Sequence, residues 1–209
     1  MKTVLCYGDS NTYGYNPENG NRYPKEIRWV NILASLLGND YEVISEGLNG
    51  RTTAFDRDNE DTKNGLKHFK AIYNSHRPVD YLIFMLGTND CSSDVDVSAK
   101  EICLGMEKLV LKAKDVALEK QGYLPKIIIV VPAKIRADYK GTKFEYQLND
   151  DSIYKANELI HYYKELAIKH NCLYLDASNL EVSKIDCEHL TVEAHEDLAK
   201  LLKNIIINN

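Results

Sequence analysis

Short apolar runs alternate along this chain with longer segments in which apolar residues recur every three or four positions. The short runs have the length of buried strands, and the longer segments have the periodicity of amphipathic helices. The predicted strands cover residues 2–7, 41–45, 80–86, 126–131 and 172–175. The predicted helices cover residues 27–37, 61–75, 97–119, 152–170 and 192–207. The alternation predicts an α/β fold with a five-stranded parallel sheet and helices on both of its faces.

The third predicted strand, residues 80–86, is almost uninterrupted in its hydrophobicity. Strands that are buried on both faces have this composition, which is typical of parallel sheets. Ligands of such sheets bind beyond the carboxyl ends of the strands. We therefore expect the functional side chains in the segments that directly follow the strands.

Two connections, residues 14–26 and 132–151, each exceed a dozen residues without clear periodicity. Loops of this length often form substrate-binding walls or assembly contacts, and the alternative is a mobile surface loop. Three tyrosines of the N-terminal region (Tyr13, Tyr15 and Tyr23) are candidates for lining an acyl pocket, or else for packing.

Length and composition narrow the class of protein. The 209 residues, 44% hydrophobic and 27% charged, predict one globular domain spanning 1–209. A net charge of -5 argues against a nucleic-acid partner, and no apolar run approaches the roughly 20 residues of a membrane helix. The five scattered cysteines include no C-x-x-C pair, and the N-terminus has no secretory pattern, so we expect reduced thiols and a cytoplasmic location.

A serine follows the first predicted strand in the sequence Gly8-Asp9-Ser10. Gly8 allows a sharp turn, so the Ser10 hydroxyl is expected to lie exposed above the sheet. A serine in this position can act as a nucleophile while its N–H donates to an oxyanion. The same turn is also an ordinary way to leave a strand, so partners at other strand ends decide between the two interpretations.

Such partners follow the other predicted strands. His189 is the candidate base, and Asp186, three residues earlier, is placed to bond the second imidazole nitrogen. Gly50 and Asn89 are candidate oxyanion donors, through a backbone N–H and a side-chain amide respectively. Gly47 remains an alternative to Gly50.

Four sequence blocks, GDS at 8–10, GLNGR at 47–51, GTND at 87–90 and D-x-x-H at 186–189, resemble the SGNH or GDSL-type hydrolases in content and order. Residues 28–29, 46–53 and 85–90 are more narrowly similar to the small bacterial arylesterase, acyltransferase and acetyl-xylan-esterase branch. The resemblance covers nearly the whole chain. It implies a flavodoxin-like three-layer α/β/α sandwich, no metal or other cofactor, and a homo-oligomer.

The same resemblance implies roles for the candidate residues. Ser10 would be the nucleophile, His189 the base and Asp186 the acid that orients it. The oxyanion donors would be Ser10, Gly50 and Asn89. Asn11 stands where the family name expects leucine, a departure expected to affect packing more than chemistry.

Other polar residues near these blocks are assigned structural roles. Asp9 and Asp90 are expected to brace their loops, because Asp in turns bonds the nearby backbone. His195 is expected to face solvent near the start of the last helix, and Cys187 to be structural.

The leading hypothesis is a serine esterase that hydrolyses small short-chain esters, with acetylated sugars among the candidate substrates, through an acyl-enzyme on Ser10. The first alternative is an acyltransferase that passes the acyl group to an alcohol or amine. The second is a non-catalytic flavodoxin-like binding module.

Overall fold

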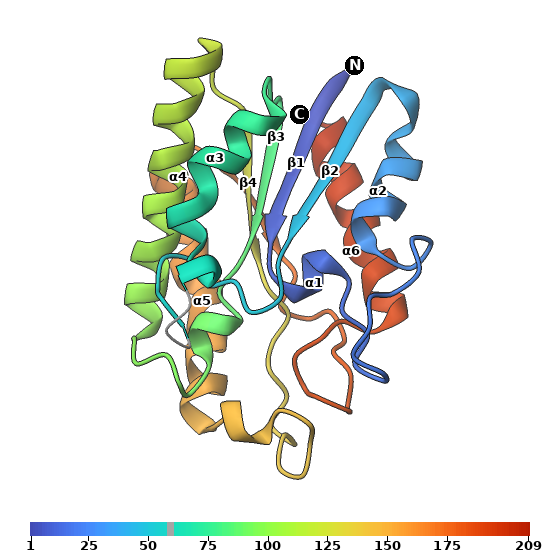
Figure 1. The fold of residues 1–209 in the computed structure, drawn as a ribbon, viewed down its shortest axis with the longest axis vertical. Helices are drawn as coiled ribbons and strands as arrows, with labels where there is room; N and C mark the ends of the chain where they lie inside the picture. Colours follow the sequence, from blue (N-terminus) through green and yellow to red (C-terminus); the bar gives the residue numbers. More distant parts are fainter. Residues whose placement is uncertain (58–60) are drawn as a thin grey trace.

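The computed structural model describes residues 1–57 and 61–209, and a parallel sheet runs through its centre (Figure 1). Its strands are β1 (Lys2–Gly8), β2 (Tyr41–Gly47), β3 (Tyr81–Met85), β4 (Lys126–Val131) and β5 (Leu173–Asp176). All four strand pairings are parallel, in the order β2-β1-β3-β4-β5. The predicted five-stranded parallel sheet is confirmed.

Helices cover both faces of the sheet, which gives the predicted three layers. They are α1 (Ser10–Tyr13), α2 (Trp29–Leu37), α3 (Gly65–His76), α4 (Ala99–Gln121), α5 (Asp150–Lys169) and α6 (Val192–Ile207). Short 3-10 turns are η1 (Gly38–Asp40), η2 (Asp61–Lys63), η3 (Asn89–Cys91) and η4 (Glu145–Gln147). In Figure 1, α3, α4 and α5 lie on one face of the sheet, and α2 and α6 lie on the other.

The core consists of two hydrophobic clusters separated by the sheet. Successive strand residues point to opposite faces, so Leu82 and Phe84 of β3 join the cluster under α3, α4 and α5. Ile83 and Met85 of the same strand join the cluster under α2 and α6. This two-sided burial explains why the sequence of β3 shows no polar alternation.

Side-chain caps set the starts of several helices, and α6 and α3 illustrate this. Thr191 caps α6 by accepting a hydrogen bond from the Ala194 N–H at 3.2 Å. The helix predicted to begin at residue 61 begins at Gly65 instead. Asn64 caps it by accepting from the Lys67 N–H, and the three residues before Asn64 form η2.

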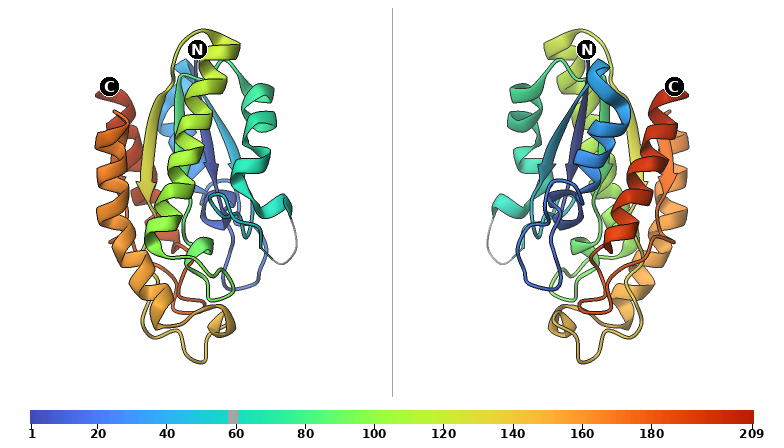
Figure 2. Two further views of the ribbon diagram at one scale, coloured as in Figure 1. Left: turned by 90° about the vertical axis from the view of Figure 1, so that its left-hand side faces the viewer. Right: turned by 90° about the vertical axis from the view of Figure 1, so that its right-hand side faces the viewer.

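The loops that follow the carboxyl ends of the strands gather at one end of the molecule, and both termini lie at the other (Figure 2). Residues 14–26 and 132–149, the two long connections, both reach this loop end. The third element there is the segment between β5 and α6, which carries the D-x-x-H block. Candidate site residues that are far apart in sequence are thereby brought to one end of the sheet.

His195 does not face solvent, and that expectation was wrong. It is fully buried where α6 packs against α2, and its Nδ1 accepts a hydrogen bond from the Trp29 N–H at 3.4 Å. The Tyr23 ring meets the imidazole edge-on, with ring centroids 5.6 Å apart. Burial, together with the charge of His189, lowers the pKa of His195 to about 4. The helix-start position was compatible with exposure, but the neighbouring helix covers that face.

The buried imidazole makes stability sensitive to acid. Between pH 6.5 and about 4 the unfolded chain binds a proton on His195 that the folded protein excludes, so stability falls as the pH drops through this window. A His195→Asn variant keeps an acceptor for the Trp29 N–H but does not titrate. We expect wild type to lose about 2–3 kcal/mol more than the variant between about pH 7 and pH 4.5 in urea unfolding. Equal losses in the two proteins would contradict this assignment.

Candidate active site

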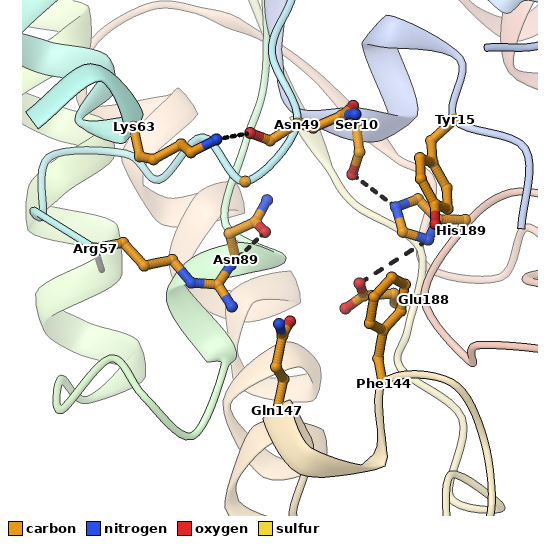
Figure 3. Close-up of a pocket in the computed structure, with 11 residues that line it drawn as sticks. Ser10, Tyr15, Asn49, Arg57, Lys63, Asn89, Phe144, Gln147, Glu188 and His189 are labelled. Carbon is orange, nitrogen blue, oxygen red and sulfur yellow. Dashed lines mark hydrogen bonds and ion pairs between the residues drawn. The ribbon is translucent and has the colours of Figure 1, made fainter. Parts of the chain in front are cut away.

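A cavity of about 200 Å³ lies at the carboxyl ends of the strands (Figure 3). The side chains and backbone that line it come from loops distant in sequence: Ser10, Tyr15, Asn49, Gly50, Arg57, Lys63, Asn89, Phe144, Gln147, Glu188 and His189. The sequence-predicted candidates Ser10, Gly50, Asn89 and His189 are all among them. Asp186 lies behind His189 and is fully buried.

Ser10 begins α1 directly after the turn that ends β1. Its Oγ lies 2.8 Å from His189 Nε2, and His189 Nδ1 lies 2.8 Å from Asp186 Oδ2. A carboxylate only accepts hydrogen bonds, so Nδ1 carries the proton and Nε2 accepts from the Ser10 hydroxyl. The predicted nucleophile, base and orienting acid thus form one hydrogen-bonded chain.

Asp186 also holds the backbone of its own loop. Its Oδ1 accepts from the N–H groups of His189 at 3.2 Å and Glu188 at 3.3 Å. This tight turn requires Cys187 to adopt a positive φ of 68°, in the region that favours glycine. Cys187 is fully buried, as expected for a structural residue.

Two opposing effects act on the proton affinity of His189. Burial lowers its pKa, but the hydrogen bond that it donates to Asp186 and the negative charges of Glu188, Asp186 and Asp9 raise it. The net result is a pKa above the ordinary value of 6.5. The imidazole is therefore a stronger base than a free histidine.

Asn11 connects the serine turn to the histidine loop. Its Oδ1 accepts from the Leu190 N–H at 2.9 Å, and its Nδ2 donates to the Glu188 carbonyl at 3.2 Å. The amide therefore bonds the backbone on both sides of His189. We expected Asn11 to matter mainly for packing, but it also positions the histidine loop. Its partners Leu190 and Glu188 are 179 and 177 residues away in the sequence, so the sequence motif did not indicate these hydrogen bonds.

The two glycines of the second block have different surroundings. A Cβ at Gly47 would lie 2.1 Å from the Tyr13 nitrogen, so that position is glycine because α1 packs against β2. Gly50 lines the cavity and has a positive φ of 79°. The geometry therefore favours Gly50 over Gly47 for contact with a bound molecule.

Arg57, which the sequence pattern did not single out, orients Asn89. Arg57 Nη1 donates to Asn89 Oδ1 at 2.7 Å, so the amide NH₂ is the end turned toward the cavity rim. That NH₂ donates to the Arg51 carbonyl at 3.2 Å, which uses one of its two hydrogens. Arg57 is itself held by Asp94 at 2.8 Å. Arg57 lies four residues beyond the 46–53 segment and outside every quoted block, so the sequence pattern gave no signal for this role.

Asp9 and Asp90, the sequence neighbours of Ser10 and Asn89, bond the backbone of nearby loops, as expected. Asp90 accepts from the Thr53 N–H and hydroxyl, and Asp9 accepts from the Asn11 N–H. Burial raises the pKa of Asp90 to about 6 and that of Asp9 to about 7. Neither aspartate lines the cavity.

Both long connections contribute walls to the cavity. The ring of Tyr15 lies 4.3 Å and that of Phe144 lies 5.8 Å from the His189 ring, centroid to centroid. The two loops also meet directly, because Lys143 Nζ lies 2.6 Å from the Tyr15 hydroxyl. Tyr15 is the tyrosine that reaches the cavity, whereas Tyr23 packs against His195.

Metal ligation has no support in the described ranges, where no three His, Cys, Asp or Glu side chains lie close enough together to hold an ion. The polar lining of the cavity comprises the Ser10 hydroxyl, the His189 imidazole, several side-chain amides, and the charged side chains of Arg57, Lys63 and Glu188.

Three comparisons with known proteins bear on this arrangement. Est24, a carbohydrate acetylesterase from Sinorhizobium meliloti, is 32% identical with a TM-score of 0.92, covering 100% of this chain and 99% of that one. The aryl esterase of M. Smegmatis is 31% identical with a TM-score of 0.91, at the same coverage. YqeF of Bacillus subtilis (strain 168), described as an uncharacterized lipoprotein, is 35% identical over 89 residues. That match spans 43% of this chain and only 32% of the length of YqeF.

A model of the GDSL-like Lipase/Acylhydrolase family matches residues 6–201, which include the serine turn and the histidine loop. The resemblance to GDSL-type hydrolases and to their small esterase branch is confirmed. The predicted enzyme class, a carboxylic ester hydrolase, agrees with that family and with both esterase structures. This chain belongs to the GDSL-like lipase and acylhydrolase family.

Proposed function

We propose that this protein is a serine esterase that hydrolyses small, short-chain carboxylic esters of the acetyl type through an acyl-enzyme on Ser10. The observation that carries the proposal is the chain of two 2.8 Å hydrogen bonds from Ser10 Oγ through His189 to Asp186. Hydroxyl nucleophiles need such a base, held in one tautomer by a third group.

The first half-reaction forms the acyl-enzyme. Ser10 Oγ attacks the ester carbonyl carbon while its proton passes to His189 Nε2. The carbonyl oxygen becomes an oxyanion, which the N–H groups of Ser10 and Gly50 and the Asn89 amide stabilise. The bond to the leaving alcohol then breaks, and His189 returns the proton to the alcohol oxygen.

The second half-reaction regenerates the enzyme. His189 takes a proton from a water molecule, whose oxygen attacks the acyl carbon. The bond to Ser10 Oγ breaks, Oγ recovers its proton from His189, and the carboxylic acid leaves. Asp186 stabilises the imidazolium in both halves without taking its proton.

The size of the cavity supports small substrates. About 200 Å³ is below the range of roughly 300–1,000 Å³ typical of sites for drug-sized ligands. The rings of Tyr15 and Phe144 close the side next to His189. An acetyl group with a compact alcohol fits this space better than a long acyl chain, and acetylated sugars are included among the proposed substrates.

Replacing Ser10 with alanine removes the nucleophile and leaves its N–H in place. We expect hydrolysis of p-nitrophenyl acetate to fall by about 10³-fold or more, with an unchanged thermal unfolding midpoint. A serine-reactive phosphonate should label wild type at Ser10 and fail to label the variant. Activity close to wild type in the variant would refute the mechanism, and unlabelled wild type would favour the non-catalytic binding module.

The raised pKa of His189 sets the acid limit of activity. His189 must be neutral to accept the Ser10 proton, so kcat/KM should fall as the pH drops through a pKa above 6.5. A Glu188→Gln variant removes one of the charges that raise this pKa. Its acid limb should therefore move to lower pH than that of wild type. A limb that stays in place or moves upward would contradict the electrostatic assignment.

Asn11→Leu removes both hydrogen bonds to the histidine loop. We expect kcat to fall about 10–100-fold with little change in KM, because a small displacement of the base is costly once substrate is bound. Active-site titration with the phosphonate separates this effect from misfolding. Misfolding would reduce the number of reactive sites at unchanged turnover per site, whereas a displaced His189 lowers turnover at each site. Wild-type kcat in this variant would show that the amide has no positioning role.

Four expectations from the sequence stay predictions: a single domain over 1–209, a homo-oligomer, a cytoplasmic location, and hydrolysis rather than transfer to an alcohol or amine. No helix in residues 1–57 and 61–209 is long and apolar enough to cross a bilayer. Product analysis in mixed alcohol and water measures the partition between acid and new ester, and sedimentation measures the assembly state.

A further inference from the structure

Glu188 places a carboxylate in the cavity that raises the pKa of His189 but takes part in no bond-making or proton-transfer step of the proposed mechanism. It lies between the two members of the Asp186–His189 pair in the loop, and its carboxylate points into the cavity in Figure 3. The side chain is only 11% exposed. Its acidic group is thus held inside the site, with Oε1 3.9 Å from His189 Nδ1.

The Glu188 carboxylate is short of hydrogen-bond donors. Within the described part of the chain, the basic group nearest to its carboxylate oxygens is His189 Nδ1 at 3.9 Å, which is beyond hydrogen-bond distance and donates its proton to Asp186. The guanidinium of Arg57, which also lines the cavity, is bonded to Asp94, Ser92 and Asn89. Burial raises the pKa of Glu188, as expected for a carboxyl that gives up water without gaining full compensation.

The backbone of Glu188 is nevertheless fixed. Its N–H donates to Asp186, and its carbonyl accepts from Asn11. The side chain therefore starts from a rigid position and is directed at the space that a substrate would fill. The carboxylate lines the cavity without a donor from the described part of the protein, so a bound ligand can supply that donor.

The direction of the reaction decides which part of a substrate meets Glu188. His189 returns its proton to the leaving oxygen, so the leaving alcohol must lie on the His189 side of the cavity. Glu188 lines that side, whereas Asn89 and Arg57 line the opposite side (Figure 3). A donor on the alcohol portion of the ester is therefore within the reach of this carboxylate.

We propose that Glu188 is a specificity-determining residue that binds a hydrogen-bond donor, a hydroxyl or a protonated amine, on the alcohol portion of the ester. This inference rests on the proposed esterase function and narrows its substrates to esters of polar alcohols. It accounts for a buried carboxylate in a site whose chemistry otherwise needs none at that position.

Two pairs of esters with closely matched shapes test the proposal. Ethylene glycol monoacetate carries a hydroxyl where propyl acetate carries a methyl group, and protonated dimethylaminoethyl acetate is matched by isopentyl acetate. Rates are compared as kcat/KM ratios within each pair, at a pH where His189 is neutral and the amine is charged. Hydrogen bonds to a charged group predict that wild type prefers at least one donor ester by about tenfold or more. Which pair shows the preference distinguishes a hydroxyl ligand from a cationic one.

Two variants separate charge from hydrogen-bond acceptance. Glu188→Leu removes the acceptor, so both ratios should fall to about 1. Glu188→Gln keeps a neutral acceptor, so it should retain part of a hydroxyl preference and lose an amine preference. The product alcohols test binding without cleavage of an ester that carries the donor. As competitive inhibitors of wild type, the alcohols with a donor should have lower inhibition constants than their apolar counterparts. This difference should vanish in Glu188→Leu.

The outcomes distinguish failure of this proposal from failure of the esterase assignment. Ratios near 1 in wild type, or wild-type ratios retained in Glu188→Leu, overturn the role of Glu188 alone. Hydrolysis of the same esters by Ser10→Ala would instead overturn the esterase mechanism. If Glu188→Leu does not fold, Glu188→Gln still tests the role of Glu188. The amine preference of the ester rates and of the alcohol inhibition should be lost in this variant, and its retention would overturn the proposal.

Discussion

The hydrogen bond between Ser10 and His189 joins two segments that are 179 residues apart, and the site depends on keeping them in register. A hydrogen bond is effective only within a few tenths of an ångström, so the two backbones must be fixed relative to one another. The Asn11 amide does this by bonding the backbone on both sides of His189. Asp186 then holds both the imidazole and the turn that carries it.

The sheet topology brings the remaining groups to the same place. β1 lies between β2 and β3, so the segments after these three neighbouring strands supply Ser10, Gly50 and Asn89 to one cavity. Parallel strands all end at the same edge, whereas antiparallel strands would send alternate loops to the opposite side. The two long connections add Tyr15 and Phe144 to the walls of the cavity.

The acidic groups around the cavity differ in the hydrogen-bond partners that the protein gives them. Asp186 and Asp90 each accept several hydrogen bonds and act as structural anchors, and Asp94 is paired with Arg57. Glu188 differs because its backbone is bonded while its carboxylate faces the space for substrate. A buried acceptor of this kind is expensive in a protein interior, and such groups are retained most often where a ligand or a reaction uses them.

The amino-acid sequence by itself determined the α/β alternation, the five parallel strands and the blocks that carry Ser10, Asp186 and His189. These features depend on local periodicity, and on short motifs whose residues lie within a few positions of one another. The ends of the helices were predicted less accurately than their existence. The start of α3, for example, depends on the hydrogen bond that the Asn64 side chain accepts, which hydrophobic periodicity does not reveal.

Only the tertiary structure decided the properties that arise from contacts between distant segments. It placed His195 in the interior, because α2 covers a face of α6 that its own sequence leaves ambiguous. It distinguished Gly50 from Gly47 through the packing of α1 against β2, and it brought Arg57 to Asn89. Hydrophobic periodicity reports which face of an element is buried, but it carries no information about which neighbour buries it. The partners of a polar side chain are therefore fixed only when the chain has folded.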